Sequence, residues 1–141
     1  MKRQSTSGVL GIRNKRVLIV AQDLDAAELY AIWLEREGYC ASITTDAARA
    51  LVIAPVLRPH AAIIDVGSPA VDAVQLVREL RELPELERCH YIAVMAYSDS
   101  RLHDHCVAAG FGSIFDKPML RSMLIGSVFA APLLAPCARF G

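Results

Sequence analysis

Short apolar segments alternate with longer amphipathic segments from Lys15 onward. Five of the short segments are apolar almost throughout: Val17–Ala21, Ala41–Thr44, Ala61–Asp65, Tyr91–Ala96 and Ser113–Asp116. Strands without polar alternation are typical of a sheet that is covered on both faces. Because segments with helical spacing separate these strands, the pattern predicts βα units and one parallel sheet.

The first amphipathic segment predicts a helix between the first two strands. Asp25 is expected to cap this helix, with Glu28 completing a capping-box pair, and Gly38 is expected to end it. Its inward stripe is predicted to consist of four residues at helical spacing: Ala26, Leu29, Tyr30 and Trp33.

The later amphipathic segments predict four further helices. They run from about Asp46 toward Leu57 with Pro55 disturbing the pattern, through Ala73, Leu76, Val77 and Leu80, from Ser98-Asp99 to Gly110, and from Pro118 onward. Five βα units in this order predict a doubly wound α/β fold, with a five-stranded parallel sheet in a flavodoxin-like three-layer α/β/α arrangement. In such sheets ligands bind at the carboxyl ends of the strands.

The composition fits one globular domain between two tails. The chain has 141 residues, of which 54% are hydrophobic and 21% charged, so a sizeable core is expected. Residues 1–14 are polar and contain glycine, which predicts a flexible N-terminal tail. The domain is expected to span residues 15–130, and residues 131–141 are expected to form a C-terminal tail.

Charge and cysteine usage argue against several classes of function. Lys plus Arg and Asp plus Glu both number 15, so the composition gives no sign of nucleic-acid binding or of attachment to an acidic membrane surface. The four cysteines form no C-x-x-C pair, which argues against zinc and redox sites.

Residues 1–15 lack the apolar core of a secretory signal, which predicts a cytoplasmic protein. Arg121 and two prolines interrupt the apolar stretch 119–137, so no membrane span is predicted.

Two charged residues at predicted strand ends are the best candidates for chemistry. Asp65 closes the third strand, where a carboxylate is placed to act as a nucleophile or to bind a metal. Lys117 follows the fifth strand, where its ammonium is placed to pair with Asp65 or with a phosphoryl oxygen. The sequence leaves open whether the Lys117-Pro118 bond is cis. The alternative interpretation is that Asp65 caps a loop and Lys117 is a solvated strand end.

With these motifs the chain resembles the receiver domain of two-component response regulators. The resemblance rests on VLIV before an acidic loop, AAIIDVGSPAVDAVQLVREL, AVMAYSD and AAGFGSIFDKP, and it covers residues 15–128. It implies phosphoryl transfer from a phosphohistidine kinase to an aspartate, with Mg²⁺ required. By position it implies that Asp65 is the phosphoacceptor and Lys117 the lysine that contacts the phosphoryl group. Pro69 and Asp72 match the loop after the acceptor.

The chain departs from the family pattern at four positions. The acidic pair that holds Mg²⁺ in the family falls on Ala21 and Gln22. The hydroxyl residue of the fourth strand falls on Met95, whose thioether donates no hydrogen bond. The aromatic switch of the fifth strand falls on Ile114. These departures indicate a degenerate, pseudo-receiver-like domain.

The same departures leave the expected metal site short of ligands. Mg²⁺ prefers octahedral oxygen ligation, usually with one or two carboxylates, and phosphoryl transfer relies on cations to offset charge. Asp65 is the one sure carboxylate. Asp23 is a weak candidate for a second, since it is also placed to turn back to the loop backbone. If Asp65 simply pairs with Lys117, the pair is structural.

Two other groups of residues are not interpreted as functional sites. His103, His105 and Cys106 resemble metal ligands, but residues two apart on a helix do not share a face, so we expect solvated histidines and a cysteine packed in the core. His60 and His90 precede strands and are interpreted as loop residues.

The last predicted helix carries a candidate interaction face. On a helical wheel from Pro118, four residues are predicted to face the sheet: Leu120, Met123, Leu124 and Ser127. Arg121, Ile125 and Phe129 lie on the opposite side, where apolar groups beside an arginine are typical of a homodimer or partner surface. The alternative is that the tail from Pro132 to Phe140 covers this side.

Taken together, these patterns predict a single-domain signalling protein that is not an enzyme and lacks an output domain. We expect it to act by contact with a sensor kinase or a downstream signalling protein, with impaired Mg²⁺-dependent phosphorylation and no bound cofactor. The alternative function is a phosphoacceptor receiver that a histidine kinase phosphorylates on Asp65 with Mg²⁺. A small-molecule binding module that uses the same strand-end crevice is a third interpretation.

Overall fold

The computed structural model describes residues 15–66, 71–96 and 100–129, and its centre is one five-stranded parallel sheet. The strands are β1 (Arg16–Val20), β2 (Cys40–Thr44), β3 (Ala61–Val66), β4 (His90–Met95) and β5 (Ser113–Asp116). Their order across the sheet is β2-β1-β3-β4-β5. The predicted doubly wound parallel sheet is confirmed, and each strand begins and ends within about one residue of its predicted bounds. The two predicted tails lie outside the described residues.

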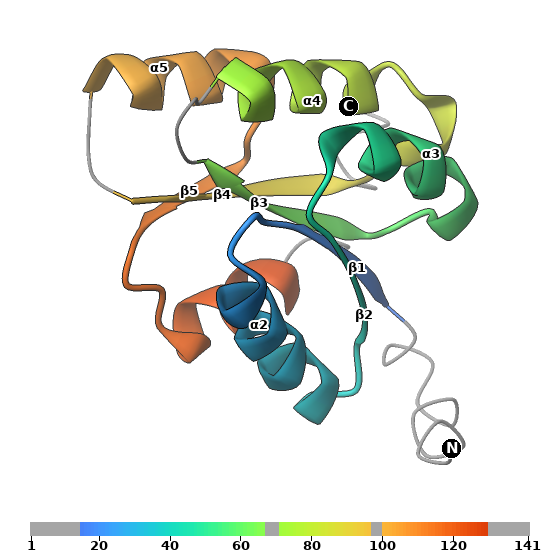
Figure 1. Cartoon of the computed structure of the whole chain (residues 1–141), viewed down its shortest axis with the longest axis vertical. Coiled ribbons are helices and arrows are strands. Elements are labelled where there is room, and N and C mark those ends of the chain that lie inside the picture. Colours follow the sequence, from blue (N-terminus) through green and yellow to red (C-terminus); the bar gives the residue numbers. More distant parts are fainter. Residues whose placement is uncertain (1–14, 67–70, 97–99, 130–141) are drawn as a thin grey trace.

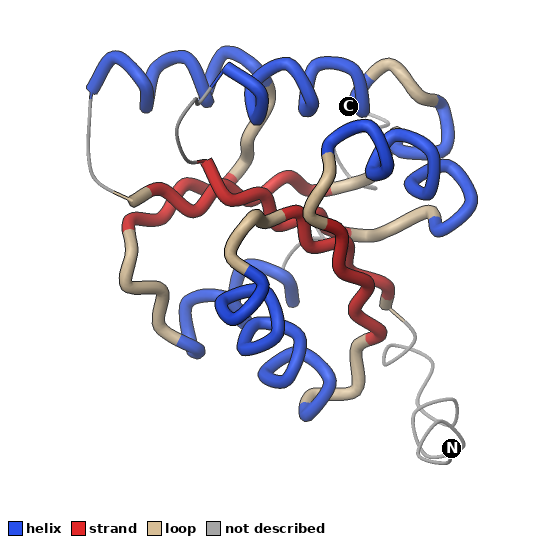
Figure 2. Tube along the Cα trace, viewed as in Figure 1, coloured by secondary structure: helices blue, strands red, loops and turns tan. Residues whose placement is uncertain are grey.

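Helices cover both faces of the sheet, as Figures 1 and 2 show. Two helices lie on one face: α2 (Leu24–Arg36) and the last helix, which is described over residues 121–129. Three lie on the other face: α3 (Ala47–Leu57), α4 (Val71–Arg81) and α5 (Ser100–Ala109), with the short 3-10 turn η2 (Pro84–Leu86) between α4 and β4. Within the described ranges, no helix has the length and apolar character that crossing a bilayer requires.

Alternating side chains of the strands fill two separate cores. In β1, Leu18 and Val20 belong to the core under α3, α4 and α5, whereas Val17 and Ile19 belong to the core under α2 and the last helix. Burying a side chain of this size contributes about 1.5–3 kcal/mol. Because each strand is covered on both sides, its sequence has no polar alternation, which explains the unbroken apolar segments.

The predicted inward stripe of α4 is confirmed. Its four members are all buried in the core on that side of the sheet: Ala73, Leu76, Val77 and Leu80. The next helix, α5, ends at Gly110, whose backbone has a φ of +122° that favours glycine. A Cβ at Gly110 would stand 2.4 Å from Cδ of Arg81, whose guanidinium donates to the carbonyl of Ala109 at 3.1 Å. This close approach joins α4 to the end of α5.

The start and the buried side of α2 correct the prediction. The N-cap is Asp23 rather than Asp25, because Oδ1 of Asp23 accepts the backbone N–H groups of Asp25 and Ala26 at 3.1 and 3.3 Å. Leu29, predicted to face inward, is 45% exposed. The residues that are buried are Ala27, Tyr30, Ala31 and Leu34. Small alanine side chains at two of these positions make the buried stripe hard to detect by hydropathy.

The start of the last helix also differs from the prediction. The helix begins at residue 121, and the carbonyl of Leu120 accepts the N–H groups of Met123 and Leu124, both at 3.1 Å. Leu120 therefore stands at the entry to the helix, and its side chain is 58% exposed instead of facing the sheet. The fully buried members of the helix are Leu124 and Val128.

Candidate functional site

The carboxyl ends of the parallel strands, which we call the carboxyl edge of the sheet, bring Asp65 and Lys117 together. Asp65 is the fifth residue of β3, Lys117 directly follows β5, and β4 lies between the two strands. The pairing of β4 with β5 aligns Met95 with Asp116, and the N–H of Lys117 donates to the carbonyl of Met95 at 2.7 Å. This hydrogen bond positions the backbone of Lys117, and the Lys117–Pro118 peptide bond that follows is cis.

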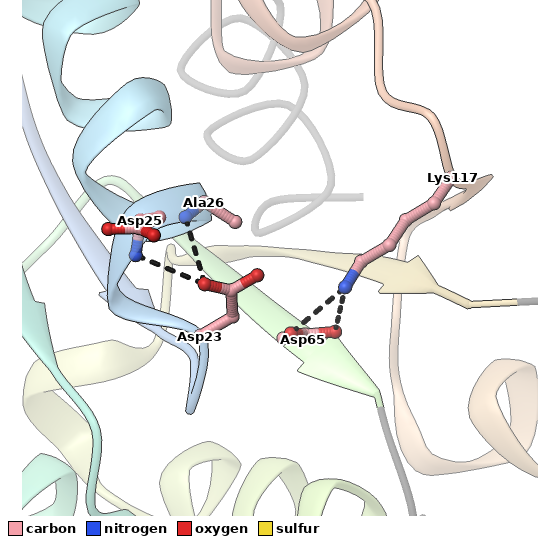
Figure 3. A network of polar contacts seen from close by, with 5 residues as sticks. All are labelled: Asp23, Asp25, Ala26, Asp65 and Lys117. Carbon is pink, nitrogen blue, oxygen red and sulfur yellow. Dashed lines mark hydrogen bonds and ion pairs between the residues drawn. The ribbon is translucent and has the colours of Figure 1, made fainter.

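The side chains of Asp65 and Lys117 form an ion pair at the end of β3 (Figure 3). Nζ of Lys117 lies 3.1 Å from Oδ1 of Asp65 and donates a hydrogen bond to Oδ2 at 3.2 Å. Oδ1 is buried and receives no hydrogen bond from the described residues, so its contact with the ammonium is electrostatic. The side chains of Lys117 and Asp65 are 30% and 13% exposed, so the pair is partly shielded from water.

Asp23 shares this edge but is held by its own helix (Figure 3). Its Oδ1 accepts both hydrogen bonds of the N-cap described above, which is the preferred role of an aspartate at a helix start. The residue is exposed, and its Oδ2 takes no part in the cap. Only one oxygen of Asp23 is therefore available to any other group.

The two positions before Asp23 bring no acid to the edge. Ala21 is 3% exposed, and its N–H donates to the carbonyl of Thr44 at 3.1 Å, which extends the pairing of β1 with β2. Gln22 is exposed. Across residues 15–66, 71–96 and 100–129, no three histidine, cysteine, aspartate or glutamate side chains are grouped to hold a metal ion.

Met95 and Ile114 give the neighbouring strands an apolar character. Met95 ends β4 and is 1% exposed, and Ile114 in β5 packs against the same core, the one under α3, α4 and α5. Neither side chain donates a strong hydrogen bond. In the part of the chain that the structure describes, the side-chain donor recorded for Asp65 is thus Lys117 alone.

Tyr30 also lies near the carboxyl edge. From its sequence pattern it was predicted to face the core, with no functional role. Burial raises the pKa of its hydroxyl, and the negative charges of Asp65 and then Asp23 raise it further. Tyr30 is 5% exposed, and the centroid of its ring lies 5.8 Å from the centroid of the Trp33 ring. Tyr30 therefore keeps a neutral hydroxyl at neutral pH in the field of two carboxylates. In the sequence, Tyr30 has the helical spacing of an ordinary core aromatic residue. No pattern therefore indicated that it would lie near the two carboxylates.

His60 lies in the loop before β3, as interpreted from the sequence, whereas His90 belongs to a strand, which corrects its interpretation as a loop residue. Both are half-buried, and His90 is the first residue of β4. Nδ1 of His60 accepts the N–H of Arg16 at 3.1 Å, and Nε2 of His90 lies 2.9 Å from Oγ of Ser113. Neither contact was predictable from the sequence, because each joins residues that are far apart in it.

The remaining candidates lie apart from the Asp65–Lys117 pair. His103 and His105 are exposed and Cys106 is buried in the core, as predicted. Pro69 lies outside the described residues, and so does the side chain of Asp72.

The predicted outer face of the last helix is only partly exposed. Arg121 is exposed and Phe129 is 52% exposed, but Ile125 is half-buried against the core under α2. The ammonium of Lys15 lies 4.8 Å from the centroid of the Phe129 ring, which gives that ring a contact with the start of the sheet.

Comparison with known proteins gives consistent matches over most of the chain. Residues 17–129 match the profile of the response regulator receiver domain. An uncharacterized 14.6 kDa protein in the sodA1 3' region of Leptolyngbya boryana is 30% identical over 103 residues, which are 73% of this chain and 79% of the relative. The transcriptional regulatory protein PrrA of Mycobacterium leprae is 28% identical over 120 residues, 85% of this chain. That match spans 51% of PrrA, so the chain covers about half of this relative's length.

Solved structures show the same fold. A CheY-like response regulator receiver domain protein from Methanospirillum hungatei is 23% identical with a TM-score of 0.76, over 91% of this chain and 99% of that one. The receiver domain of the sensor histidine kinase PA1611 from Pseudomonas aeruginosa is 23% identical with a TM-score of 0.72, over 82% and 94% of the two chains. The latter structure has a magnesium ion coordinated in its active site cleft.

Proposed function

Because this chain belongs to the response regulator receiver domain family, which serves two-component signalling, we propose that it acts by protein contact with impaired Mg²⁺-dependent phosphorylation. A sensor kinase or a downstream signalling protein is the expected partner, and no enzymatic turnover is proposed. The observation that carries the proposal is the make-up of the carboxyl edge. Asp65 and Lys117 are paired there, while positions 21 and 22 carry no acid.

The donors at this edge do not fit a magnesium site as they stand. Mg²⁺ requires near-octahedral oxygen coordination and dehydrates reluctantly. Asp65 has an ammonium against both of its oxygens, and Asp23 uses one oxygen to cap α2. Ala21 has no side-chain oxygen, and Gln22 supplies a neutral one at most. Binding a divalent ion here requires that the existing contacts of both carboxylates be broken or shared.

The ion pair also weakens Asp65 as a nucleophile. A carboxylate oxygen that attacks a phosphorus atom must give up part of its contact with the ammonium, and charge-assisted hydrogen bonds are about twice as strong as neutral ones. Met95 and Ile114 add no hydroxyl that would compensate on the side of the incoming phosphoryl group. Both effects favour a domain whose conformation does not depend on phosphorylation.

A second function rests on the same two residues. The side chain of Asp65 keeps 13% exposure beside a cation, and a cation stabilises the charge on a transferring phosphoryl group. In this alternative, an oxygen of Asp65 attacks the phosphorus of a phosphohistidine, the imidazole leaves, and an aspartyl phosphate forms.

Intact-mass spectrometry separates the two functions. The chain is incubated with acetyl phosphate, with and without Mg²⁺, next to the variant Asp65→Asn and to a receiver domain known to be phosphorylated under the same conditions. The proposal expects the reference receiver to gain one phosphoryl group and this chain to gain none. An adduct that forms on this chain and is absent from Asp65→Asn would establish the alternative and remove the proposal.

The proposed contact surface is the outer side of the last helix, formed by Arg121, Ile125 and Phe129. Arg121→Glu reverses the charge of this surface at an exposed position, and Arg49→Glu on α3 makes the same change on the opposite face of the sheet. If the partner is a second copy of the chain, light scattering will show a dimer for the natural chain and Arg49→Glu, and a monomer for Arg121→Glu. Monomers in all three would remove the homodimer version.

A further inference from the structure

A polar cluster joins the last helix to β4 and β5 at the amino ends of the strands, which we call the amino edge of the sheet. Nε2 of His90, at the start of β4, lies 2.9 Å from Oγ of Ser113, at the start of β5. It also lies 3.2 Å from Oγ of Ser127 in the last helix, and this hydroxyl donates to Oγ of Ser113 at 2.9 Å. The three side chains form a closed set of contacts at the end of the sheet opposite to Asp65.

The backbone holds the ring of His90 in this position. A Cβ added at Gly112 would stand 2.6 Å from Cε1 of His90, so the ring lies directly against the backbone of Gly112. The N–H of Gly112 donates to the carbonyl of Tyr91 at 2.8 Å, which fixes that backbone to β4. The ring therefore has little freedom to turn away from the two serines.

No carboxylate among the described residues pairs with His90. Ser113 from β5 and Ser127 from the last helix are uncharged, and toward β3 the carbonyl of His60 accepts the N–H of His90 at 2.9 Å. The thiol of Cys89 lies 3.8 Å from the carbonyl of His90. Burial lowers the pKa of His90, so its imidazole is neutral near pH 7.

The carboxyl-terminal half of the last helix has two recorded polar contacts with the rest of the described chain. One is the contact of Ser127 with His90 and Ser113. The other is a hydrogen bond of 3.3 Å that Nζ of Lys15 donates to the carbonyl of Phe129. Of the groups involved, histidine is the one whose ordinary pKa lies near neutrality. A change of pH in that range therefore acts on the helix through His90.

We propose that His90, Ser113 and Ser127 form a proton-sensitive latch for the last helix. When His90 is neutral and carries its proton on Nδ1, Nε2 accepts a hydrogen bond from Ser113, whose oxygen accepts one from Ser127, and the helix is held against β4 and β5. Protonation puts a hydrogen on Nε2, so the hydroxyl of Ser113 loses its acceptor and a half-buried cation is left without a counter-charge. The latch is complete above the ordinary histidine pKa of about 6.5. It is lost as the pH falls below that value, through the lowered pKa of the folded chain.

Histidine NMR combined with hydrogen exchange tests the latch in the full chain. The Cε1–H signal of His90 is expected to titrate below the ordinary histidine pKa of about 6.5, because burial lowers the pKa of this side chain. Protection factors of residues 121–129, corrected for the intrinsic pH dependence of exchange, are expected to fall about fivefold as His90 protonates, the factor that one neutral hydrogen bond contributes. Titration of His90 at or above the ordinary histidine pKa of about 6.5, or constant protection while it protonates, would overturn the proposal.

Three variants sharpen the test, which does not depend on phosphorylation of Asp65. His90→Gln keeps an amide oxygen near the position of Nε2 and does not titrate, so the fivefold fall is expected to disappear, whereas His103→Gln is expected to retain it. Ser127→Ala removes a latch hydroxyl without changing a titratable group, so protection is expected to be lower at every pH. A pH-dependent fall that persists in His90→Gln, or full protection in Ser127→Ala, would count against the latch.

Discussion

Charged side chains of opposite sign stabilise the helices at the two edges of the sheet. At the carboxyl edge helices begin, and aspartates accept their free N–H groups: Asp23 caps α2 and Asp46 caps α3. At the amino edge cations donate to helix carbonyls: Arg16 donates to the last residue of α3 at 2.7 Å, and Lys15 donates at 3.3 Å to the carbonyl of Phe129, the last described residue of the last helix. Both arrangements match the helix dipole.

This difference affects how many acids at the carboxyl edge are free to hold a cation. An aspartate at that edge has two competing uses, a helix cap and a ligand for a cation, and Asp23 serves as the cap. Asp65 is left with Lys117 as its charged partner. At the amino edge no such competition arises, because each cation satisfies a carbonyl that the helix leaves open. On our proposal, the number of acids at the carboxyl edge is what limits metal binding.

The largest effect is expected from adding acids to the carboxyl edge, which should raise its affinity for Mg²⁺. In the double variant Ala21→Asp, Gln22→Asp, three clustered carboxylates repel one another, and a dication relieves that repulsion. We expect Mg²⁺ affinity to rise about 100-fold, or roughly tenfold for each added charge. Isothermal titration with MgCl₂ measures the gain.

The control for this prediction is Ala21→Asn, Gln22→Asn, which has nearly the same shape without the charges. Because Ala21 is buried, Gln22→Asp alone at its exposed position serves as the variant that is certain to leave the core intact. Equal Mg²⁺ affinity in the aspartate and asparagine variants would contradict the prediction.

A pair of glycine substitutions sharpens the account of the amino edge. Gly112→Ala drives a methyl group into the ring of His90 and is expected to destabilise the fold by about 1–3 kcal/mol. Gly126→Ala places the same methyl group on an exposed side of the last helix with nothing within 4 Å. It is expected to stabilise the fold by about 0.5–1 kcal/mol. Urea denaturation measures both, and effects of equal sign would show that the His90 contact does not constrain Gly112.

Removing the cation of the carboxyl edge should have a smaller effect. Lys117→Met leaves Asp65 largely shielded from water without its partner, and we expect a loss of about 1–2 kcal/mol, between the values for exposed and fully buried pairs. In a double-mutant cycle with Asp65→Asn, part of this loss should be recovered. Strictly additive losses in urea denaturation would mean that the ion pair contributes nothing to stability.

The smallest effect is expected from the other histidine of the amino edge. Burial lowers the pKa of His60, and the charges of Arg16 and then Lys15 lower it further. Nδ1 of His60 accepts the N–H of Arg16 only when it carries no proton. The stability that this group contributes is therefore complete above about pH 6.5 and declines as the pH falls through its lowered pKa.

His60→Asn tests this prediction because it keeps an acceptor at the position of Nδ1 and does not titrate. Urea midpoints between about pH 8 and about pH 5 are expected to fall less steeply for this variant than for the natural chain. The exposed His105→Asn is the matched control and should follow the natural chain. Identical slopes for His60→Asn and the natural chain would remove the proposed role of His60.

The strands and the Asp65–Lys117 edge were predictable because their signals are local. A strand that is covered on both faces is an unbroken apolar segment, and the residues that follow it lie at the sheet edge whatever the rest of the chain does. Parallel pairing then brings strand ends together. Asp65 and Lys117 were therefore placed near each other although they are 52 residues apart.

The helix starts and the amino edge could not be predicted in the same way. Asp23 and Asp25 both suit an N-cap, and the course of the chain after β1 selects Asp23. The contacts of His90 depend on the register of β4 against β5 and on the rotation of the last helix, which carries Ser127 37 residues away. Neither quantity is encoded in a short pattern of residues.

The contact between Lys15 and Phe129 has a practical consequence for circular permutation of the domain. Lys15 is the first described residue and Phe129 the last, and the ammonium of one lies 4.8 Å from the ring of the other. The two ends of the described chain thus meet at the edge of the sheet that is farther from Asp65. A circular permutant of residues 15–129 that joins Lys15 to Phe129 therefore needs only a short linker, and the new connection lies away from Asp65.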